Sequence, residues 1–541
     1  MSLDPRRWQE QCADANVDFV FVESAWAGNN RLWRGKLAGP AGPAPEFHDL
    51  MKWCREHGVP TVFWNKEDPP HYADFLAAAR LADWVFTSDE GRVASYREDL
   101  GHERVAVLPF AAQPAIHNPV RPAHGRHGRD VAFAGMYFAH KYPERRHQLD
   151  VLLGGAMDVS ADMKHGLEIF SRMLDGGAEY QFPAPLAGHV VGSLSYDRML
   201  TAYKAYKVFL NVNSVVDSPS MCARRIFEIT ASGTPVISGP SAAIPEFFAP
   251  DEVPLVATRG EAAQFIRSLV RNAEHNDRTV HLAQRRIWSG HTYAHRAETV
   301  VAAAAPRQAR PLVRPSVSAL VSTIRGAQLE HICRMLGSQE GVSPQLVLLA
   351  HGIPLAEREV HAVAREHGIE DVVFLSEPSD TPLGACLNRC VAAADGQILT
   401  KMDDDDHYGP QYLSDQLFAM QYSNADVVGK QAHYMYLTES DAVILRSGER
   451  EHRFTDFVMG PTITARAEIV RKTPFPALQR GEDTAFLKRV AAAGGSIYSA
   501  DRFNYVQMRN GSGHTWQIGE AELLATGDLK FYGRPYEHVD I

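Results

Sequence analysis

Short, continuous apolar runs alternate with amphipathic stretches through the first part of the chain. Runs of this kind are typical of strands buried on both faces, and their alternation with helices predicts a parallel α/β sheet. The strands predicted for a first domain, residues 1–120, are 19–24, 59–64, 84–88 and 105–110. The helices predicted beside them are 8–15, 46–57 and 72–81.

The same rhythm resumes after a connection rich in Pro, Gly and His over residues 113–128. Strands are predicted at 130–135, 208–212 and 236–238, and a helix is predicted at 222–232. We therefore predict a second domain over residues 121–305. Two α/β units in series suggest an enzyme of two lobes with its site in the cleft between them.

A helix end at Ala302–Ala305 is followed by a stretch rich in Pro and Arg, so residues 306–315 are predicted to be a linker. A new α/β pattern begins at Ser316. Its predicted strands are 317–323, 345–349, 372–375 and 397–402, with helices at 329–336 and 383–394. Residues 316–541 are therefore predicted to form a further domain with a C-terminal tail.

Four consecutive aspartates, Asp403, Asp404, Asp405 and Asp406, directly follow the last of these strands. Carboxylates with an ordinary pKa of about 4 are all ionised at neutral pH, so crowding them at a strand end favours a bound cation. Mg²⁺ or Mn²⁺ fits, because these ions take few protein carboxylates and fill their other positions with water and substrate phosphate. Ligands bind outside the carboxyl ends of strands in open α/β sheets, which favours a metal-diphosphate site over a solvated acidic turn.

The composition is that of an ordinary globular protein, with 45% hydrophobic and 22% charged residues. A formal net charge of -10 argues against a nucleic-acid partner. The six cysteines are scattered without a CxxC pair, which fits reduced thiols in a cytoplasm. No signal peptide or bilayer-spanning run is apparent, so we expect a soluble cytoplasmic protein, with peripheral contact at the inner face of the membrane left open.

The segment Ser218–Glu228 places hydroxyl groups ahead of a predicted helix. A helix N-terminus stabilises phosphate through its dipole and its unpaired N–H groups. Arg224 or Arg225 would add bidentate contacts to a diphosphate, and Glu228 would accept hydrogen bonds from ribose hydroxyls. A capped surface helix in which Arg and Glu merely pair explains the same pattern equally well.

Glu67 and Asp68 follow the strand predicted at 59–64, where a carboxylate would face the cleft of a two-lobed enzyme. Asp68 is therefore a candidate general base. The commoner role for such a residue is to cap a turn, here the one at Pro69-Pro70.

Five motifs of this first half occur in a characteristic order: Trp64–Pro69, Ala82–Asp89, Leu108–Ala111, Arg225–Glu228 and Gly233–Pro235. Together they resemble the CgeB-like (spore maturation protein) glycosyltransferases. The resemblance covers most of residues 17–300 and implies a GT-B fold, a pair of Rossmann-like lobes. It also implies a nucleotide-sugar site in the second lobe and an acceptor site in the first.

Two further candidates lie downstream of the aspartate run. Glu482 and Asp483 open a predicted helix after Gly481, where the helix dipole favours carboxylates and where one of them is also placed to act as a general base. His514 lies in the Gly-rich segment 511–516. A lone histidine is more often structural, but imidazole on a loop is also a plausible metal ligand.

From residue 316 to about 520 the chain resembles glycosyltransferase family 2, which has a GT-A fold. The resemblance implies that Asp403 lies on the nucleoside side of the donor and that Asp404 also binds the donor. It implies that Asp405 is the metal ligand of the Asp-x-Asp motif, with Asp406 beside it at the metal. It further implies that Asp483 is the base and His514 an additional metal ligand. Ser322, Thr323 and Arg325 occupy the strand end that usually meets the nucleotide base.

The sequence as a whole predicts a bimodular α/β glycosyltransferase, a GT-B-like half joined to a metal-dependent, inverting GT-A half. The expected donors are nucleotide sugars, UDP-sugars being favoured, and the expected acceptor is a glycan, glycolipid or polymer. Two alternatives stay open. One is a single active GT-A transferase with a non-catalytic, acceptor-binding N-terminal half, and the other is a phosphotransferase acting on a polyol-phosphate polymer.

Overall fold

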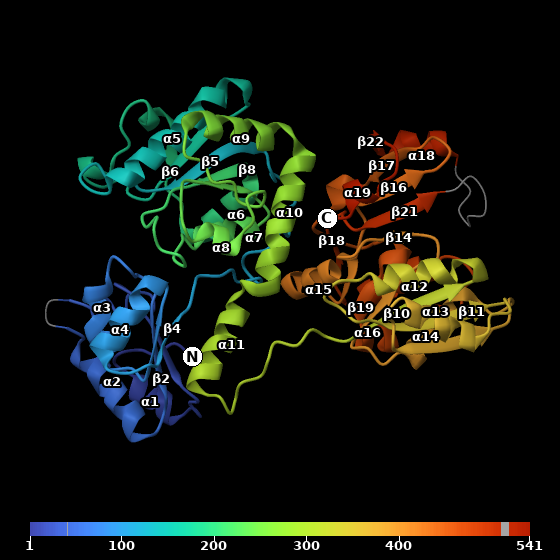
Figure 1. The fold of residues 1–541 in the computed structure, drawn as a ribbon, viewed down its shortest axis with the longest axis horizontal. Coiled ribbons are helices and arrows are strands. Elements are labelled where there is room, and N and C mark those ends of the chain that lie inside the picture. The colour runs from blue at the N-terminus through green and yellow to red at the C-terminus, as the bar shows by residue number, and fades with distance from the viewer. Residues whose placement is uncertain (40–41, 510–518) are drawn as a thin grey trace. The chain divides into compact units, whose positions relative to one another are not determined.

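The computed structural model describes residues 1–39, 42–509 and 519–541, which divide into two compact units. The first unit comprises Met1–His117 and Gly125–Leu312, and the second comprises Asn118–His124 and Val313–Ile541. Each unit is a mixed α/β structure built on Rossmann-like parallel strands (Figure 1). No helix among the described residues is both long and apolar enough to cross a membrane.

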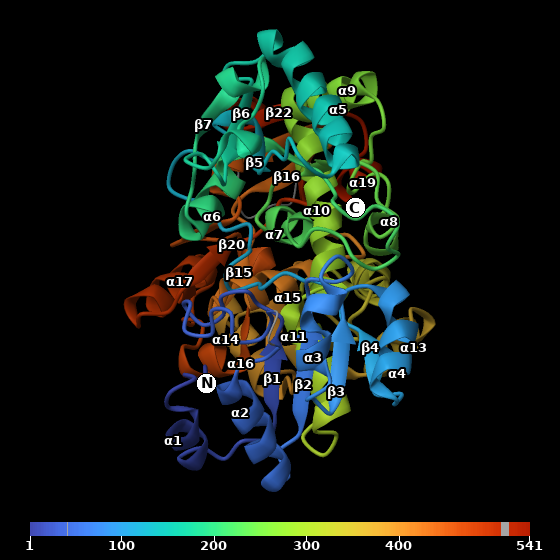
Figure 2. The same ribbon diagram turned by 90° about the vertical axis from the view of Figure 1, so that its left-hand side faces the viewer.

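The first lobe of the first unit holds a four-stranded parallel sheet in the order β1-β2-β3-β4. Figure 2 shows β1, β2 and β3 side by side. The central strand β2 is buried along its whole length, as its apolar sequence predicts. The strands are β1 (Val20–Glu23), β2 (Thr61–Asn65), β3 (Trp84–Thr87) and β4 (Val105–Val107), and the helices are α1 (Trp8–Ala13), α2 (Pro45–Glu56), α3 (Tyr72–Ala79) and α4 (Val93–Leu100).

The second lobe of this unit holds a five-stranded parallel sheet in the order β7-β6-β5-β8-β9. The strands are β5 (Arg129–Gly135), β6 (Leu167–Ser171), β7 (Val190–Gly192), β8 (Tyr206–Asn211) and β9 (Val236–Ser238). The helices are α5 (Pro143–Val159), α6 (Tyr196–Ala205), α7 (Arg225–Ala231), α8 (Ile244–Phe247), α9 (Arg259–Arg271), α10 (Ala273–Gly290) and α11 (Tyr293–Ala304). Strands β6 and β7 extend the sheet on one side of β5, and β8 and β9 extend it on the other side. The strand order therefore reverses between β5 and β8, at a switch point of the kind that binds ligands.

The last helix of the first unit returns to the first lobe. Ala112 and Thr292 form an isolated parallel bridge at the start of α11. One turn into the helix, Arg296 donates hydrogen bonds to the carbonyls of Pro109 and Phe110. These contacts join the two lobes within one unit.

The main sheet of the second unit has the order β12-β11-β10-β13-β19-β15-β20-β18. Its first four strands are parallel, and β19 then runs antiparallel to both β13 and β15. The strands are β10 (Val317–Thr323), β11 (Gln345–His351), β12 (Val372–Glu377), β13 (Ile398–Lys401), β15 (Val427–Gly429), β18 (Arg453–Thr455), β19 (Thr464–Arg466) and β20 (Ile497–Ser499). The helices are α12 (Leu329–Gly337), α13 (Glu357–Glu366), α14 (Leu383–Ala393), α15 (Tyr412–Ser423), α16 (Ala467–Lys472), α17 (Glu482–Ala492), α18 (Glu520–Thr526) and α19 (Tyr536–Val539).

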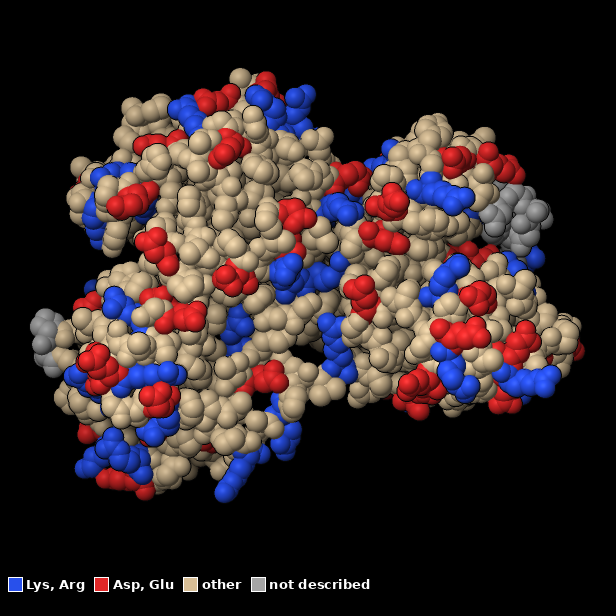
Figure 3. Space-filling view, viewed as in Figure 1, with Lys and Arg blue, Asp and Glu red and all other residues tan. Residues whose placement is uncertain are grey.

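A smaller sheet in the second unit has the order β14-β21-β16-β17-β22. Its strands are β14 (His407–Tyr408), β16 (His433–Leu437), β17 (Ala442–Arg446), β21 (Tyr505–Arg509) and β22 (Asp528–Tyr532). On the face drawn in Figure 3, acidic and basic side chains are interspersed, without a broad region of either sign. That face therefore lacks the basic stripe that a nucleic-acid-binding surface would need.

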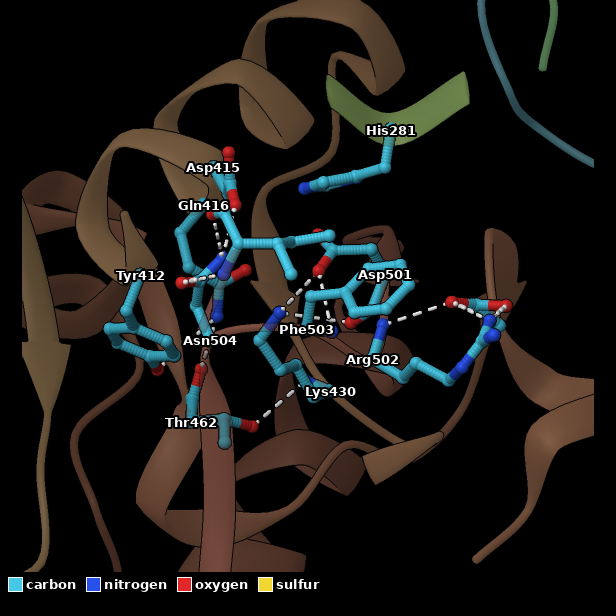
Figure 4. Close-up of polar contacts among 12 residues, drawn as sticks. His281, Tyr412, Asp415, Gln416, Lys430, Thr462, Asp501, Arg502, Phe503 and Asn504 are labelled. Carbon is cyan, nitrogen blue, oxygen red and sulfur yellow. Dashed lines mark hydrogen bonds and ion pairs between the residues drawn. The ribbon is translucent and has the colours of Figure 1, made fainter. Parts of the chain in front are cut away.

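The segment Asn118–His124 belongs to the second unit, although the chain on both sides of it belongs to the first. Arg121 forms a buried ion pair with Glu451 at 2.6 Å, and its backbone N–H donates to the carbonyl of His452. Arg502 pairs with the same Glu451 carboxylate at 3.0 Å (Figure 4). The predicted boundaries at 120 and 305 do not assign this segment to the C-terminal half, because its anchoring partners lie more than 300 residues downstream in the sequence.

Candidate active site

A cavity of about 760 Å³ in the second unit opens at the carboxyl ends of β10 and β13. These two strands are neighbours at the point where the order of the parallel strands reverses. Such a switch point is where open α/β sheets bind their ligands. The polar residues lining the cavity include Ser322, Arg325, His351, Lys401, Asp403, Asp404, Arg480, Glu482 and Asp483.

Lys401, the last residue of β13, lies between two of the predicted site carboxylates. Its Nζ is 2.7 Å from Asp403 Oδ1 and 3.3 Å from Asp483 Oδ2. The side chain of Lys401 is only 7% exposed. Burial by itself lowers the pKa of Lys401, but Asp403 and Asp483 more than offset this and raise it. The ammonium group therefore stays charged and binds the two carboxylates together.

Asp483 opens α17, as predicted, and presents its two carboxylate oxygens to different surroundings. Oδ2 lies against Lys401 and against Gly460, where an added Cβ would come within 2.0 Å of it. Oδ1 is buried and has no hydrogen-bond partner among the described residues. Burial raises the pKa of Asp483, partly opposed by Lys401. A carboxylate with a raised pKa and one oxygen left to accept is suited to act as a general base.

Glu482 is the neighbouring candidate base, and only 4% of it is exposed. Burial, reinforced by the charge of Asp483, raises the pKa of Glu482 to about 7. Two adjacent carboxyl groups of this kind titrate as a pair, so one of them carries a proton over part of the neutral range.

A buried polar network supports the turn that carries Gly460, and Figure 4 shows its members Lys430, Thr462 and Asp501. The backbone N–H of Lys430 donates to Thr462 Oγ1, and Thr462 Oγ1 donates to the carbonyl of Met459. The Lys430 side chain is 0% exposed and pairs with Asp501 at 2.9 Å. Because both partners of this ion pair are buried, the turn is held in one position beside Asp483.

Asp404 was predicted to contact the donor, but its carboxylate is already engaged within the protein. It is 4% exposed, accepts a hydrogen bond from Thr323 Oγ1 and forms a bidentate ion pair with Arg325. Arg325 also lies 2.9 Å from Asp405 Oδ2. Asp404 is therefore better described as the residue that fixes Thr323 and Arg325 at the cavity, and Arg325 as the cation that offsets the repulsion within the aspartate run.

The predicted metal ligands do not share one environment. Asp406 is 3% exposed, and its two oxygens accept hydrogen bonds from Tyr505 Oη and from the backbone N–H of Met508. Burial raises the pKa of Asp406 well above its ordinary value. This placement does not favour the expectation that Asp406 contributes to a metal site, because both carboxylate oxygens accept hydrogen bonds from β21. His514 lies outside the described residues.

Asp405 is the member of the run that fits a divalent cation best. Its side chain is 16% exposed, and its Oδ2 lies 2.9 Å from Arg325, which also pairs with Asp404. Mg²⁺ and Mn²⁺ are commonly held by one or two protein carboxylates together with substrate phosphate. The donor set of this site therefore fits such an ion.

Ser322, which was predicted to meet the donor, lines the cavity together with His351, which was not predicted. Ser322 Oγ and His351 Nε2 are both buried and have no hydrogen-bond partner among the described residues. His351 ends β11, the strand beside β10. His351 follows the strand predicted at 345–349, much as Thr323 ends the one predicted at 317–323. That position in the sequence is the signal from which it could have been predicted.

In the first unit, Glu228 lies at the centre of a buried polar cluster. Its carboxylate accepts hydrogen bonds from Tyr196 at 3.2 Å and Tyr203 at 3.3 Å, and lies 3.4 Å from Arg224 Nε. His117 Nε2 is 2.8 Å from the same Tyr196 hydroxyl. Glu228 and Arg224 thus form the pair that the alternative interpretation predicted, with the Glu228 side chain buried and that of Arg224 54% exposed.

Arg145 is an additional candidate that the sequence pattern did not identify. It lies beside Gly135 at the end of β5, and its Nη1 donates to Ser214 after β8. Its buried Nε has no hydrogen-bond partner among the described residues. Burial and the nearby charge of Arg225 lower the pKa of Arg145 to about 10. Two arginines at a sheet switch point provide an anion site of the kind predicted for Arg225.

The serines predicted to bind phosphate are instead bonded to the first lobe. The helix predicted at 222–232 begins three residues later, at Arg225, so these serines do not lie at its N-terminus. Ser218 Oγ donates to Asp89 Oδ1 at 2.6 Å, and Ser220 Oγ donates to the carbonyl of Ser88. Their hydroxyls therefore join the two lobes.

Asp68 was predicted as a possible base, but it is fully buried. Its carboxylate accepts hydrogen bonds from Asn65 at 2.7 Å and from Thr87 at 2.6 Å. Burial raises the pKa of Asp68 to about 6. A carboxylate enclosed in this way cannot reach a substrate hydroxyl, so its position favours the structural alternative, a residue that fixes the ends of β2 and β3.

Comparisons with known proteins match parts of the chain. Residues 159–302 match the family model described as glycosyl transferase-like. Spore protein CgeB of Bacillus subtilis (strain 168) is 26% identical over 80 residues, which are 15% of this chain and 25% of that protein. The chain thus spans about a quarter of the length of this curated relative.

Two solved structures are similar at low identity. The mannosyltransferase PcManGT from Pyrobaculum calidifontis, in complex with GDP-Man and Mn²⁺, is 14% identical over 38% of this chain and 60% of that chain, with a TM-score of 0.32. S. aureus TarS in complex with UDP-GlcNAc is 15% identical over 39% of this chain and 64% of that chain, with a TM-score of 0.31.

The family match lies in the second lobe of the first unit, around Glu228 and Arg225. The chain therefore carries a glycosyltransferase-like domain over residues 159–302.

Proposed function

We propose that this chain is a bimodular glycosyltransferase that moves sugars from nucleotide-sugar donors to a glycan or glycolipid acceptor. In this proposal the second unit is an inverting GT-A domain of family 2. The observation that carries it is Asp483, whose Oδ1 accepts no hydrogen bond from any described residue and whose Oδ2 is held by Lys401 at the switch-point cavity.

Residues around the cavity divide into a donor side and an acceptor side. Ser322 and Arg325, at the end of β10, are proposed to meet the nucleotide. Asp403, whose side chain is 40% exposed, is proposed to accept hydrogen bonds from the ribose. Asp483, at the start of α17, lines the same cavity and is proposed to face the acceptor hydroxyl.

The proposed reaction is a single displacement. Asp483 takes the proton of the acceptor hydroxyl as its oxygen forms a bond to the anomeric carbon of the sugar. The bond from that carbon to the diphosphate oxygen breaks, and the diphosphate leaves with the electron pair. Attack from the face opposite the leaving group inverts the anomeric centre.

Asp405 would hold a divalent cation in this proposal. Such an ion, when bound, offsets the negative charge that develops on the leaving diphosphate. Arg325 supplies positive charge at the same place from the protein itself, through its contacts with Asp404 and Asp405.

The decisive experiment presents purified full-length protein with a panel of UDP- and GDP-sugars, with Mn²⁺ or with EDTA. We expect one donor to raise the thermal midpoint in the presence of Mn²⁺ and to release nucleoside diphosphate when an acceptor glycan is supplied. A mass increase of one sugar residue on the acceptor supports the proposal, whereas the addition of a phosphoalcohol identifies a phosphotransferase. No binding and no transfer across the panel would contradict the proposed function.

The first unit is proposed to be a second transferase, with Arg145 and Arg225 on the donor diphosphate and Glu228 on the ribose. Support comes from the buried Arg145 Nε at the switch point and from the family match over the same lobe. The alternative is an acceptor-binding scaffold, in which Glu228 only stabilises the fold.

Glu228→Gln is expected to abolish one of two transfer steps while the step of the second unit persists. Losing a hydrogen bond to a charged group costs about 1.5–3 kcal/mol, which corresponds to about 10–100-fold in donor affinity. Products of the variant should be compared by mass with those of Glu246→Gln, an exposed glutamate in the same lobe. An unchanged product pattern in a folded Glu228→Gln variant would instead identify the first unit as a scaffold.

A further inference from the structure

The position of Lys401 is unusual for a strand residue in a parallel sheet. β13 is buried along its whole length, and a lysine there must desolvate its ammonium group. Substituting buried charged groups by apolar residues of similar size is often neutral or stabilising. The presence of the lysine is therefore better explained by what its charge does at the cavity than by packing.

Lys401 connects the two elements on which the site is built. Its backbone lies in β13, next to the aspartate run, and its Nζ reaches Asp483 on α17. Gly460 closes the other side of Asp483, since a Cβ there would meet Oδ2 at 2.0 Å. The carboxylate is thus held between an ammonium group and a glycine, with Oδ2 fixed and with Oδ1 bonded to no donor in the described part of the chain.

We propose that Lys401 is a positioning residue for the transfer reaction, whose ammonium group fixes Oδ2 of Asp483 so that Oδ1 stays in place as the proton acceptor. This inference rests on the proposed function of the second unit. Lys401 acts through Asp483 and does not itself touch the substrate.

The charges that face Asp483 determine what removal of Lys401 does. Asp403 and Glu482 are the acidic neighbours, Lys401 is the cation in contact, and Arg446 and Arg480 line the same cavity. Without Lys401, two negative groups act on Asp483 and no cation contacts it. The pKa of Asp483 then rises further, and less of the basic form is present at a given pH.

Lys401→Met is therefore expected to shift the acid limb of the pH profile of kcat/KM to higher pH by about one unit or more. A shift of one unit means that the loss relative to wild type is about tenfold greater on the acid side of the limb than on its alkaline plateau. Lys401→Arg retains the charge and should keep the limb near its wild-type pH. The matched control is Lys488→Met, which removes an exposed lysine from α17. A loss by one constant factor at every pH would overturn the inference, because a purely structural role predicts it.

A second readout needs no activity. When folding raises the pKa of an acidic group, the protein loses stability as pH rises from the group's pKa in the unfolded state through its pKa in the folded state. The melting deficit of Lys401→Met relative to wild type should thus grow from acid to neutral pH. Adding Asp483→Asn to that variant should remove most of this growth, and a deficit independent of pH would contradict the inference. If the wild type transfers no sugar, the proposed function fails, while the melting series still decides whether Lys401 holds Asp483.

Discussion

Asp483→Asn is expected to lower turnover by about 10²–10⁴-fold while donor affinity stays near the wild-type value. Asn retains the size of the side chain and tolerates a helix start, but it cannot take a proton from the acceptor. The loss of the helix-dipole interaction alone would cost only about 0.3–1 kcal/mol of stability. Turnover and donor binding should therefore separate in this variant.

Steady-state kinetics and donor titration on one preparation of Asp483→Asn make that comparison. Asp380→Asn, an exposed loop aspartate in the same unit, controls for the loss of a carboxylate in general. Near-normal transfer with a slightly lower melting temperature would reduce Asp483 to a helix-start residue. Glu482, with its pKa near 7 and its place beside the cavity, would then be the next base to test.

The strand pattern of the second unit could be predicted from sequence because its apolar runs are continuous and bounded by polar segments. The strand predicted at 317–323 is β10, Val317–Thr323, and the run at 397–402 contains β13, Ile398–Lys401. Parallel strands buried on both faces leave this strong local signal. The aspartate run consequently follows the carboxyl end of a strand, as predicted, and the strand order places that end at a switch point of the sheet.

The separate roles of the four aspartates could not be predicted, because these roles depend on contacts with residues distant in sequence. Asp404 is fixed by Thr323 and Arg325, and Asp406 by Tyr505, about a hundred residues away. Four identical adjacent residues carry no local difference from which these roles follow. Lys401 is hidden for the same reason, since a lysine at the end of an apolar strand usually indicates the strand's exit into solvent.

In the first unit, the local positions of several residues are as predicted, but their contacts in the folded structure are not. Ser218 and Ser220 precede a helix, yet their hydroxyls bond to Asp89 and to the carbonyl of Ser88 in the first lobe. Asp68 follows a strand, yet it is enclosed rather than open to a ligand. The serine contacts depend on how the two lobes pack, and the enclosure of Asp68 depends on partners from neighbouring elements of its own lobe, such as Thr87. Periodicity along one segment encodes neither.

Asp405→Ala is expected to abolish metal-dependent transfer by the second unit without unfolding it. A cation that stabilises the leaving diphosphate contributes several kcal/mol, so turnover should fall by about 10²-fold or more. The fold should persist because Arg325 still pairs with Asp404, and because removing one of four adjacent carboxylates lowers their mutual repulsion.

Two measurements on Asp405→Ala separate metal binding from catalysis. In the wild type, a bound ion raises the melting temperature as its concentration increases, and the variant should lose this rise with Mn²⁺. Turnover against Mn²⁺ concentration should show the same loss. Asp528→Ala, which removes an exposed aspartate from β22, should behave as the wild type in both. If Asp405→Ala keeps wild-type activity and an intact Mn²⁺-dependent rise in melting temperature, Asp405 is excluded as the metal ligand. Asp403, the more exposed of the two carboxylates that pair with Lys401, would then be the residue to substitute next.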